Sequence, residues 1–169
     1  MRAPLLAAAL ACGAAHANQA GPAGDPEYFV EGLRCLDGKH SLVLPPTLPA
    51  LVAMAPGVQV QDLRKETNGD GETLVHQLVR YPGLAIQLVA YGRDRNRYSL
   101  EKVEIRSADW ARLSPFAVGR TIGEARGILG EISKDDETLR SVYQGENESV
   151  RFETKGERVS AIIYECYTG

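Results

Sequence analysis

Few residues of this 169-residue chain could do chemistry. They are the cysteines at positions 12, 35 and 166 and the histidines at positions 16, 40 and 76. A hydrolytic site needs a nucleophile held by a base such as histidine. Neither His40 nor His76 lies in a recognisable nucleophile motif such as G-x-S-x-G. We therefore interpret both as ordinary strand or turn residues, and an enzyme built on one of them stays an alternative.

Metal and cofactor motifs are also missing from the sequence. It contains no H-E-x-x-H and no paired C-x-x-C. Residues 66–71 resemble the first half of a calcium loop, but Gln77 stands where a bidentate glutamate is needed, so the segment is typical of a polar turn. No glycine loop precedes a helix to hold phosphate. The sequence thus predicts a protein without catalytic activity, cofactor or metal.

The first 17 residues have the pattern of a signal peptide. Arg2 is followed by an apolar run over residues 5–15 and by the small-x-small site that ends at Ala17. Cleavage after Ala17 would leave two cysteines, Cys35 and Cys166, in an oxidising compartment. We expect these two to form a disulfide in a periplasmic protein.

A membrane anchor and a lipid anchor are the alternatives to a cleaved signal peptide at this end. A membrane anchor needs roughly 20 apolar residues, and this run is shorter, so we expect no membrane span. Leu10-Ala11-Cys12 resembles the end of a lipobox, so a lipid anchor at Cys12 is an alternative. The net charge of −3 disfavours nucleic acid as a partner.

The first half of the remaining chain predicts one short helix and several strands. Residues 18–27 read as a flexible lead-in, and Asp37-Gly38 joins two expected strands at 33–36 and 41–44 as a hairpin. Thr47 is typical of a helix N-cap, with Pro56-Gly57 as the stop. Further strands are expected at 74–81, 84–91 and 98–106, the first two joined by Pro82-Gly83.

The second half repeats this order after Trp110, which we expect to fill the core. Thr121 and Glu124 form a capping box, and Gly130 ends the helix. Strands are expected at 139–144, 149–154 and 158–167. The fold class is α+β, with short helices packed on an antiparallel β-meander sheet. It is either two tandem helix-plus-sheet units, at 28–110 and 111–169, or one domain.

A partner-binding site is suggested by arginines that alternate through one loop. Arg93, Arg95 and Arg97 lie between Tyr91 and Tyr98. Arginine and tyrosine are common anchors of protein interfaces, and the guanidinium groups suit acidic surfaces. The alternative is a solvated loop, because runs of charge usually face water.

Residues 119–130, GRTIGEARGILG, resemble a family pattern. The pattern is the G-x-T-x-x-E-[AV]-x-x-[IL]-[LF]-G helix of the beta-lactamase inhibitor protein fold and of the small lipoprotein subunit of the outer-membrane β-barrel assembly machine. The resemblance implies helices on an antiparallel sheet and the binding of other proteins. The chain departs from it in lacking a proline after Gly130 and in having only one disulfide, between its ends.

Export, the missing catalytic motifs and this resemblance favour one function. We expect a periplasmic protein-binding module, an inhibitor or immunity-type protein, whose partner is another envelope or secreted protein. The alternative is an outer-membrane assembly or envelope structural factor, which a lipidated Cys12 would favour.

Overall fold

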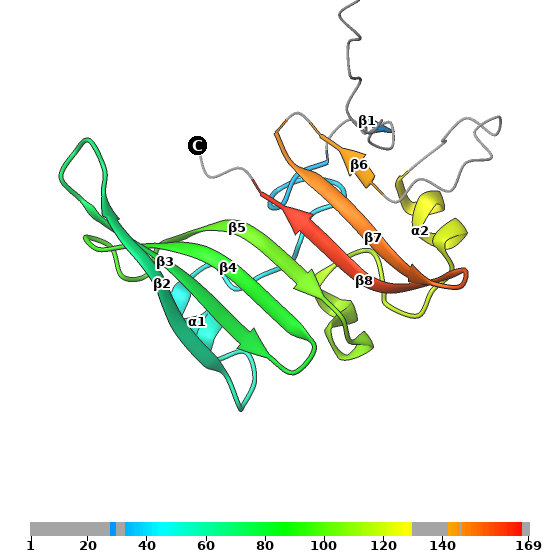
Figure 1. Cartoon of the computed structure of the whole chain (residues 1–169), viewed down its shortest axis with the longest axis horizontal. Coiled ribbons are helices and arrows are strands. Elements are labelled where there is room, and N and C mark those ends of the chain that lie inside the picture. Colours follow the sequence, from blue (N-terminus) through cyan, green and yellow to red (C-terminus); the bar gives the residue numbers. More distant parts are fainter. Residues whose placement is uncertain (1–27, 30–32, 130–141, 146, 167–169) are drawn as a thin grey trace, which may run out of the picture.

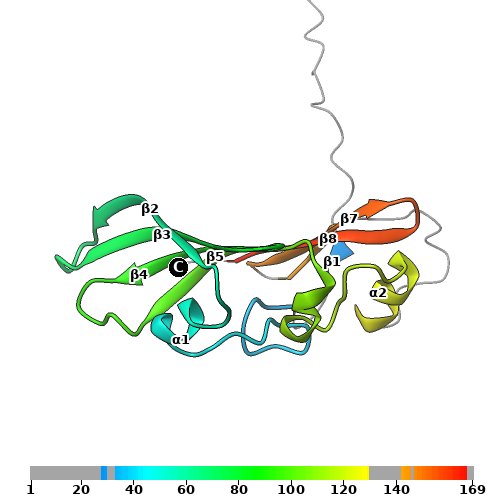
Figure 2. The same ribbon diagram turned by 90° about the horizontal axis from the view of Figure 1, so that it is seen from below.

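The secondary structure is one sheet with short helices on one side (Figures 1 and 2). The computed structural model describes residues 28–29, 33–129, 142–145 and 147–166. The helices are α1 (Leu48–Val52), the 3₁₀ helix η1 (Ala108–Leu113) and α2 (Ile122–Leu129). The strands are β1 (Tyr28–Phe29), β2 (Gln59–Thr67), β3 (Thr73–Tyr81), β4 (Leu84–Tyr91), β5 (Tyr98–Ile105), β6 (Val142–Gln144), β7 (Ser149–Lys155) and β8 (Arg158–Glu165).

The strand order is β1-β6-β7-β8-β5-β4-β3-β2. The short β1 pairs with β6 in parallel, and every other neighbouring pair is antiparallel. Two meanders, β2–β5 and β6–β8, therefore share one sheet, and their last strands β5 and β8 pair with each other. The expected α+β class with an antiparallel meander sheet is confirmed.

Local signals place the helices and turns where the sequence predicts them. The Thr47 hydroxyl accepts a hydrogen bond from the amide of Ala50 at the start of α1. At α2 the Glu124 carboxylate accepts from the Thr121 amide at 2.8 Å, and the Glu124 amide donates to the Thr121 hydroxyl at 3.2 Å. The capping box of the sequence is therefore formed.

The core lies between the sheet and the helical layer. Alternate residues of β4, namely Leu84, Ile86 and Leu88, are buried against the residues that the helices contribute. Trp110 of η1 is buried among them, and its indole N–H donates to the carbonyl of Pro82 at 2.8 Å. The expected core role of this tryptophan is confirmed.

The hairpin expected at residues 33–44 is not formed, which corrects that prediction. The segment consists of bends, a turn and extended backbone, and only the amide of Leu42 pairs across it, to the carbonyl of Cys35. Asp37 turns the chain in the left-handed region, at φ 58°. The extended part joins the helical layer, because the amide of Val43 donates to the carbonyl of Leu113.

The expected disulfide between Cys35 and Cys166 is present, with 131 residues of sequence separation. Because the sequence predicts strands at 33–36 and 158–167, we expect the bond to join the first and last strands, and its position differs. Cys35 lies in the irregular segment, and Cys166 follows directly after β8. The bond therefore ties this segment of the helical layer to the end of the central strand pair.

Some predictions fall outside the described residues. They are the signal peptide at 1–17 with Cys12, the lead-in at 18–27, the helix stop at Gly130 and the ends of two expected strands, at 139–141 and 167. Within the described part of the chain, no helix combines the length and the hydropathy needed to cross a membrane.

His40 is buried in the helical layer without a partner for its Nδ1 atom. Its ring stacks on Phe116 with the centroids 6.3 Å apart, and its carbonyl accepts from the Tyr164 hydroxyl at 3.1 Å. Burial lowers the pKa of His40, and the charge of Lys39 lowers it further. The folded protein thus favours the neutral ring.

This burial predicts a loss of stability in mild acid. The unfolded chain takes up a proton on His40 near its ordinary pKa of about 6.5, whereas the folded protein does so only at lower pH. The stabilisation is therefore complete above that pH and is lost as the pH falls through the lowered pKa. We expect the free energy of unfolding in urea to fall between about pH 7 and pH 5, and His40→Phe to flatten this slope. An unchanged slope in the variant would assign the effect to another group.

Candidate functional site

One face of the sheet carries no helix or loop of the described residues (Figure 2). We call it the open face. Along each strand, the side chains of the open face alternate with those that enter the core. The pairing of the strands therefore shows which residues belong to the open face. On β4, for example, Ala85, Gln87, Val89 and Tyr91 belong to the open face, opposite the core residues of that strand.

Two rows of directly paired residues run across the open face through all seven antiparallel strands. The first row is Gln61, Leu78, Gln87, Lys102, Glu165, Ser149 and Gln144. The second is Gln59, Arg80, Ala85, Glu104, Ile163, Arg151 and Val142. Polar and charged side chains make up most of both rows, so the face is a broad polar surface and not an exposed apolar one.

An ion pair spans β8 at one end of this face. Arg106, next to β5, donates to the carboxylate of Glu153 on β7 at 2.8 Å and also contacts Glu104. The side chain has to pass over β8, where Ala161 pairs with Glu153 and is fully buried. A small residue at position 161 leaves room for the arginine. The two carboxylates raise the pKa of Arg106, chiefly through Glu153, which keeps the pair charged.

A second group of charges surrounds His76 on β3, and we call it the His76 cluster: His76, Arg64, Glu66 and Glu101. The Nδ1 atom of His76 lies 2.6 Å from Glu101 Oε1 and 3.4 Å from the Arg64 guanidinium. The Nε2 atom lies 3.1 Å from Glu66 Oε1, in a direction that suits an ion pair and not a hydrogen bond. The histidine is only 5% exposed although it belongs to the open face.

The side chains of the His76 cluster form a network of charged groups that hold one another in place. The neighbouring ring, and then Arg64, lower the pKa of Glu66. The cluster thus keeps two carboxylates and one guanidinium, from β2 and β5, fixed around the ring of His76 on β3.

Catalysis or metal binding by the His76 cluster has little geometric support. The Nε2 atom, which would act as the base if Glu101 oriented the ring, is buried and faces Glu66. The two carboxylates lie at opposite ring nitrogens and do not converge on one point. Across the described ranges, no three histidine, cysteine or acidic side chains are placed to hold a metal ion.

The structure separates the residues that the sequence assigns to partner binding. Tyr91 is on the open face, with the Arg97 guanidinium 4.5 Å from the centre of its ring and its hydroxyl 2.8 Å from that of Ser99. Tyr98 points to the helical side, where its hydroxyl donates to the carbonyl of Pro45 and burial raises its pKa.

The other two arginines differ in their contacts. Arg93 donates to the carbonyl of Asp70 at 2.8 Å, and its amide donates to Glu72 at 3.1 Å, so it fixes the loop to the β2–β3 turn. Arg95 is exposed. Tyr91 and Arg97 are therefore the pair that the fold brings together, beside the His76 cluster, because Tyr91 pairs with Leu74 two residues before His76.

Sequence reasoning did not single out the His76 cluster. A partial signal was present, since the turn at residues 68–71 places Glu66 opposite Leu74 and hence near His76. Nothing in the sequence indicated that Glu101 belongs to the cluster, because Glu101 lies on β5 and reaches the histidine across β4.

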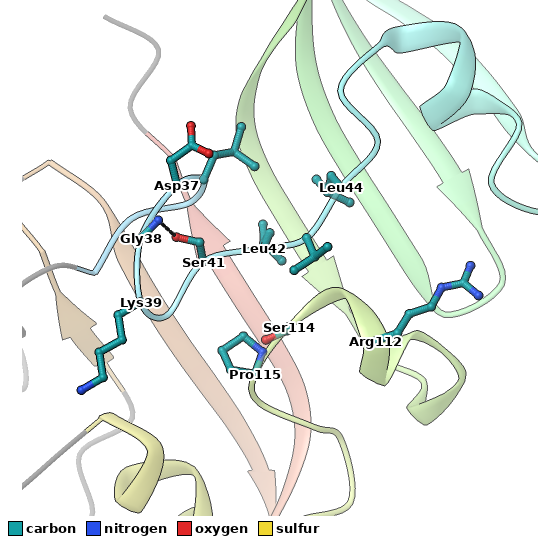
Figure 3. Close-up of a pocket in the computed structure, with 11 residues that line it drawn as sticks. Asp37, Gly38, Lys39, Ser41, Leu42, Leu44, Arg112, Ser114 and Pro115 are labelled. Atoms are coloured by element: carbon teal, nitrogen blue, oxygen red, sulfur yellow. Dashed lines mark hydrogen bonds between the residues drawn. The ribbon is translucent and has the colours of Figure 1, made fainter.

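A groove of about 620 Å³ lies on the opposite side of the molecule (Figure 3). It is lined by residues 36–39 and 41–44 of the irregular segment and by Arg112, Ser114 and Pro115. Val43 at its edge is 69% exposed. Lys39 points away from the groove, and Arg112 lies at its other end (Figure 3). Ligand sites usually combine an apolar lining with polar groups that converge, which this groove lacks.

Comparison with known proteins identifies no family for the chain. No protein-family model matches it, and neither a curated protein nor a solved structure shows a significant match.

Proposed function

We propose that the protein is an exported protein-binding module, of inhibitor or immunity type, which binds its partner through the open face. The observation that carries the proposal is the seven-strand polar face left uncovered by the described helices. A face with this many fixed polar side chains is wide enough to meet another folded protein. Its partner would be another envelope or secreted protein.

The side chains of the open face are held before any partner arrives. Arg106 is held by two carboxylates, and His76 lies between two others. Ordering such long side chains normally costs free energy on binding, about 0.5–1.5 kcal/mol for each. Prior ordering removes part of this cost, which supports a binding role.

The arrangement of Tyr91 and Arg97 supplies the anchor. Tyrosine and arginine are enriched among residues that dominate binding energy. Here the guanidinium covers the ring at the edge of the face, next to the His76 cluster. We propose that these two residues anchor the contact at this edge of the face, with the exposed Arg95 as an outer contact.

The topology also supports two tandem helix-plus-sheet units, as the family resemblance implies. A helix precedes each meander, both helices lie on the same side of the sheet, and the last strands of the meanders pair. This symmetry is what a duplication would leave. The disulfide supports export, because such bonds persist in oxidising compartments. We propose the periplasm as the location, after cleavage behind Ala17.

Affinity capture from periplasmic extract tests the function. We expect one partner to be retained in stoichiometric amount, and its Kd can then be measured by calorimetry. Replacing Tyr91 and Arg97 together by alanine should weaken binding about 30-fold, which corresponds to a loss of about 2 kcal/mol. The control is Val43→Ser, a change at an exposed residue on the helical side. Equal weakening by the control, or none by the double variant, would contradict the proposal, as would the absence of a retained partner.

A further inference from the structure

Strand β2 ends the sheet on one side, so one edge of its backbone pairs with no strand among the described residues. All nine of its residues are exposed, including Val60 and Leu63, each 46% exposed. An edge of this length is a template for another strand, and natural proteins usually protect such edges with charges or bulges. β2 has both features.

The bulge decides which charges share a face. Pairing with β3 shifts between Asp62 and Arg64, with Leu63 as the extra residue. Asp62 and Lys65 pair with Gln77 and Val75, so both belong to the helical side of the strand. Their ion pair, at 3.3 Å, is direct evidence of the shared side. Without the bulge, residues three apart would lie on opposite faces.

We propose that β2 pairs with β2 of a second copy, antiparallel about a two-fold axis between Leu63 and Arg64. In this register Asp62 lies opposite Lys65 of the second copy, and Lys65 lies opposite its Asp62. Gln61 lies opposite Glu66, and Val60 opposite Thr67. Every pair outside the bulge joins residues of the same face, which is what an antiparallel ladder requires.

Other registers fit less well. A shift by one residue pairs side chains of opposite faces, which a ladder does not allow. A shift by two residues keeps the faces but sets Asp62 opposite Leu63 and Lys65 opposite Val60. Only the proposed register sets Asp62 opposite Lys65, and it does so twice, so the charges that deter other strands favour a second copy. This inference does not rest on the proposed function.

Sedimentation equilibrium of the full protein, from low micromolar to about 500 μM in about 150 mM salt, tests the proposal. We expect a monomer–dimer equilibrium. Asp62→Lys or Lys65→Asp alone sets like charges opposite each other at two positions, and each should weaken dimerisation about 10-fold or more. Circular dichroism should be unchanged, since both side chains are exposed. Lys155→Gln, an exposed change on β7 in the other half of the sheet, is the matched control and should have little effect.

Mixing the two charge variants separates contact between copies from effects within one chain. The Asp62→Lys chain carries two lysines and the Lys65→Asp chain two aspartates, so each repels itself. Together they restore both attractive pairs, and the mixture should dimerise as tightly as the unchanged protein. A monomer at all concentrations, single variants that dimerise normally, or a mixture that stays monomeric would each overturn the proposal.

Discussion

Replacing Cys35 and Cys166 together by alanine is expected to lower the free energy of unfolding by about 5 kcal/mol, the chain-entropy value for a loop of this length. The disulfide mainly restricts the unfolded chain, and its ends are 131 residues apart. Most domains are stable by only 5–15 kcal/mol, so the loss would be a large fraction. Alanine suits the buried Cys35 better than serine, whose hydroxyl would need a partner.

Denaturation in guanidinium chloride, with the oxidised protein, the reduced protein and the double variant compared, measures the effect. The reduced protein should resemble the variant. In the folded state the amide of Cys35 still has the Glu148 carboxylate as acceptor, and the amide of Cys166 still donates to the carbonyl of Glu101. The near-ultraviolet spectrum should therefore be retained at 25 °C. A loss below about 1 kcal/mol would show that the closed loop does not control stability.

Turns and caps could be predicted from the sequence because the groups that form them are neighbours in the chain. Thr47 caps the residues that follow it, and Pro82-Gly83 reverses the chain between two apolar runs. The disulfide could be predicted from the number of cysteines, although Cys35 and Cys166 are 131 residues apart. These signals needed no knowledge of what the rest of the chain does.

The segment at residues 33–44 shows where local reasoning fails. Leu33 to Leu36 has the composition of a strand, but the amide of Cys35 bonds to the side chain of Glu148, 113 residues away. That contact and the disulfide hold the segment in the helical layer, where no strand of the described residues pairs with it. Tertiary contacts thus override a strand preference, which is weak and depends on context.

The candidate site was partly predictable for a related reason. Tyr91 and Tyr98 seem equivalent in sequence, yet one faces the open side and the other the core. The His76 cluster depends on Glu101, which lies at a shift of register between β4 and β5. Bulges cannot be located from composition, and a displacement by one residue changes the face of every side chain that follows.

Gly83→Ala is expected to destabilise the fold by about 2–5 kcal/mol through two separable effects. Gly83 has φ +73°, and an alanine pays about 1–2 kcal/mol in this left-handed region. A Cβ atom there would also lie 2.4 Å from Cβ of Ser107, which is too close to be tolerated without movement. Such overpacking typically costs a further 1–3 kcal/mol or so.

Movement of the turn at Gly83 would displace residues of the core. The carbonyl of Gly83 accepts from the amide of Arg106 at 2.8 Å, and the carbonyl of Pro82 accepts from the indole of Trp110 at 2.8 Å. Both bonds fix the turn to the chain that leaves β5. Because Trp110 is the one tryptophan of the sequence, its fluorescence in the folded state should report any displacement in Gly83→Ala.

Gly156→Ala is the matched control for the two effects. Gly156 turns β7 into β8 at φ +63°, but nothing lies within 4 Å of its added Cβ atom. This variant should therefore show the backbone cost alone, about 1–2 kcal/mol. Combining Gly83→Ala with Ser107→Gly removes the contact between the two Cβ atoms, so the two changes should cost less together than the sum of the single variants. If urea denaturation gives equal losses for the two alanine variants and full additivity in the combination, the close approach of turn and chain at Ser107 does not limit stability.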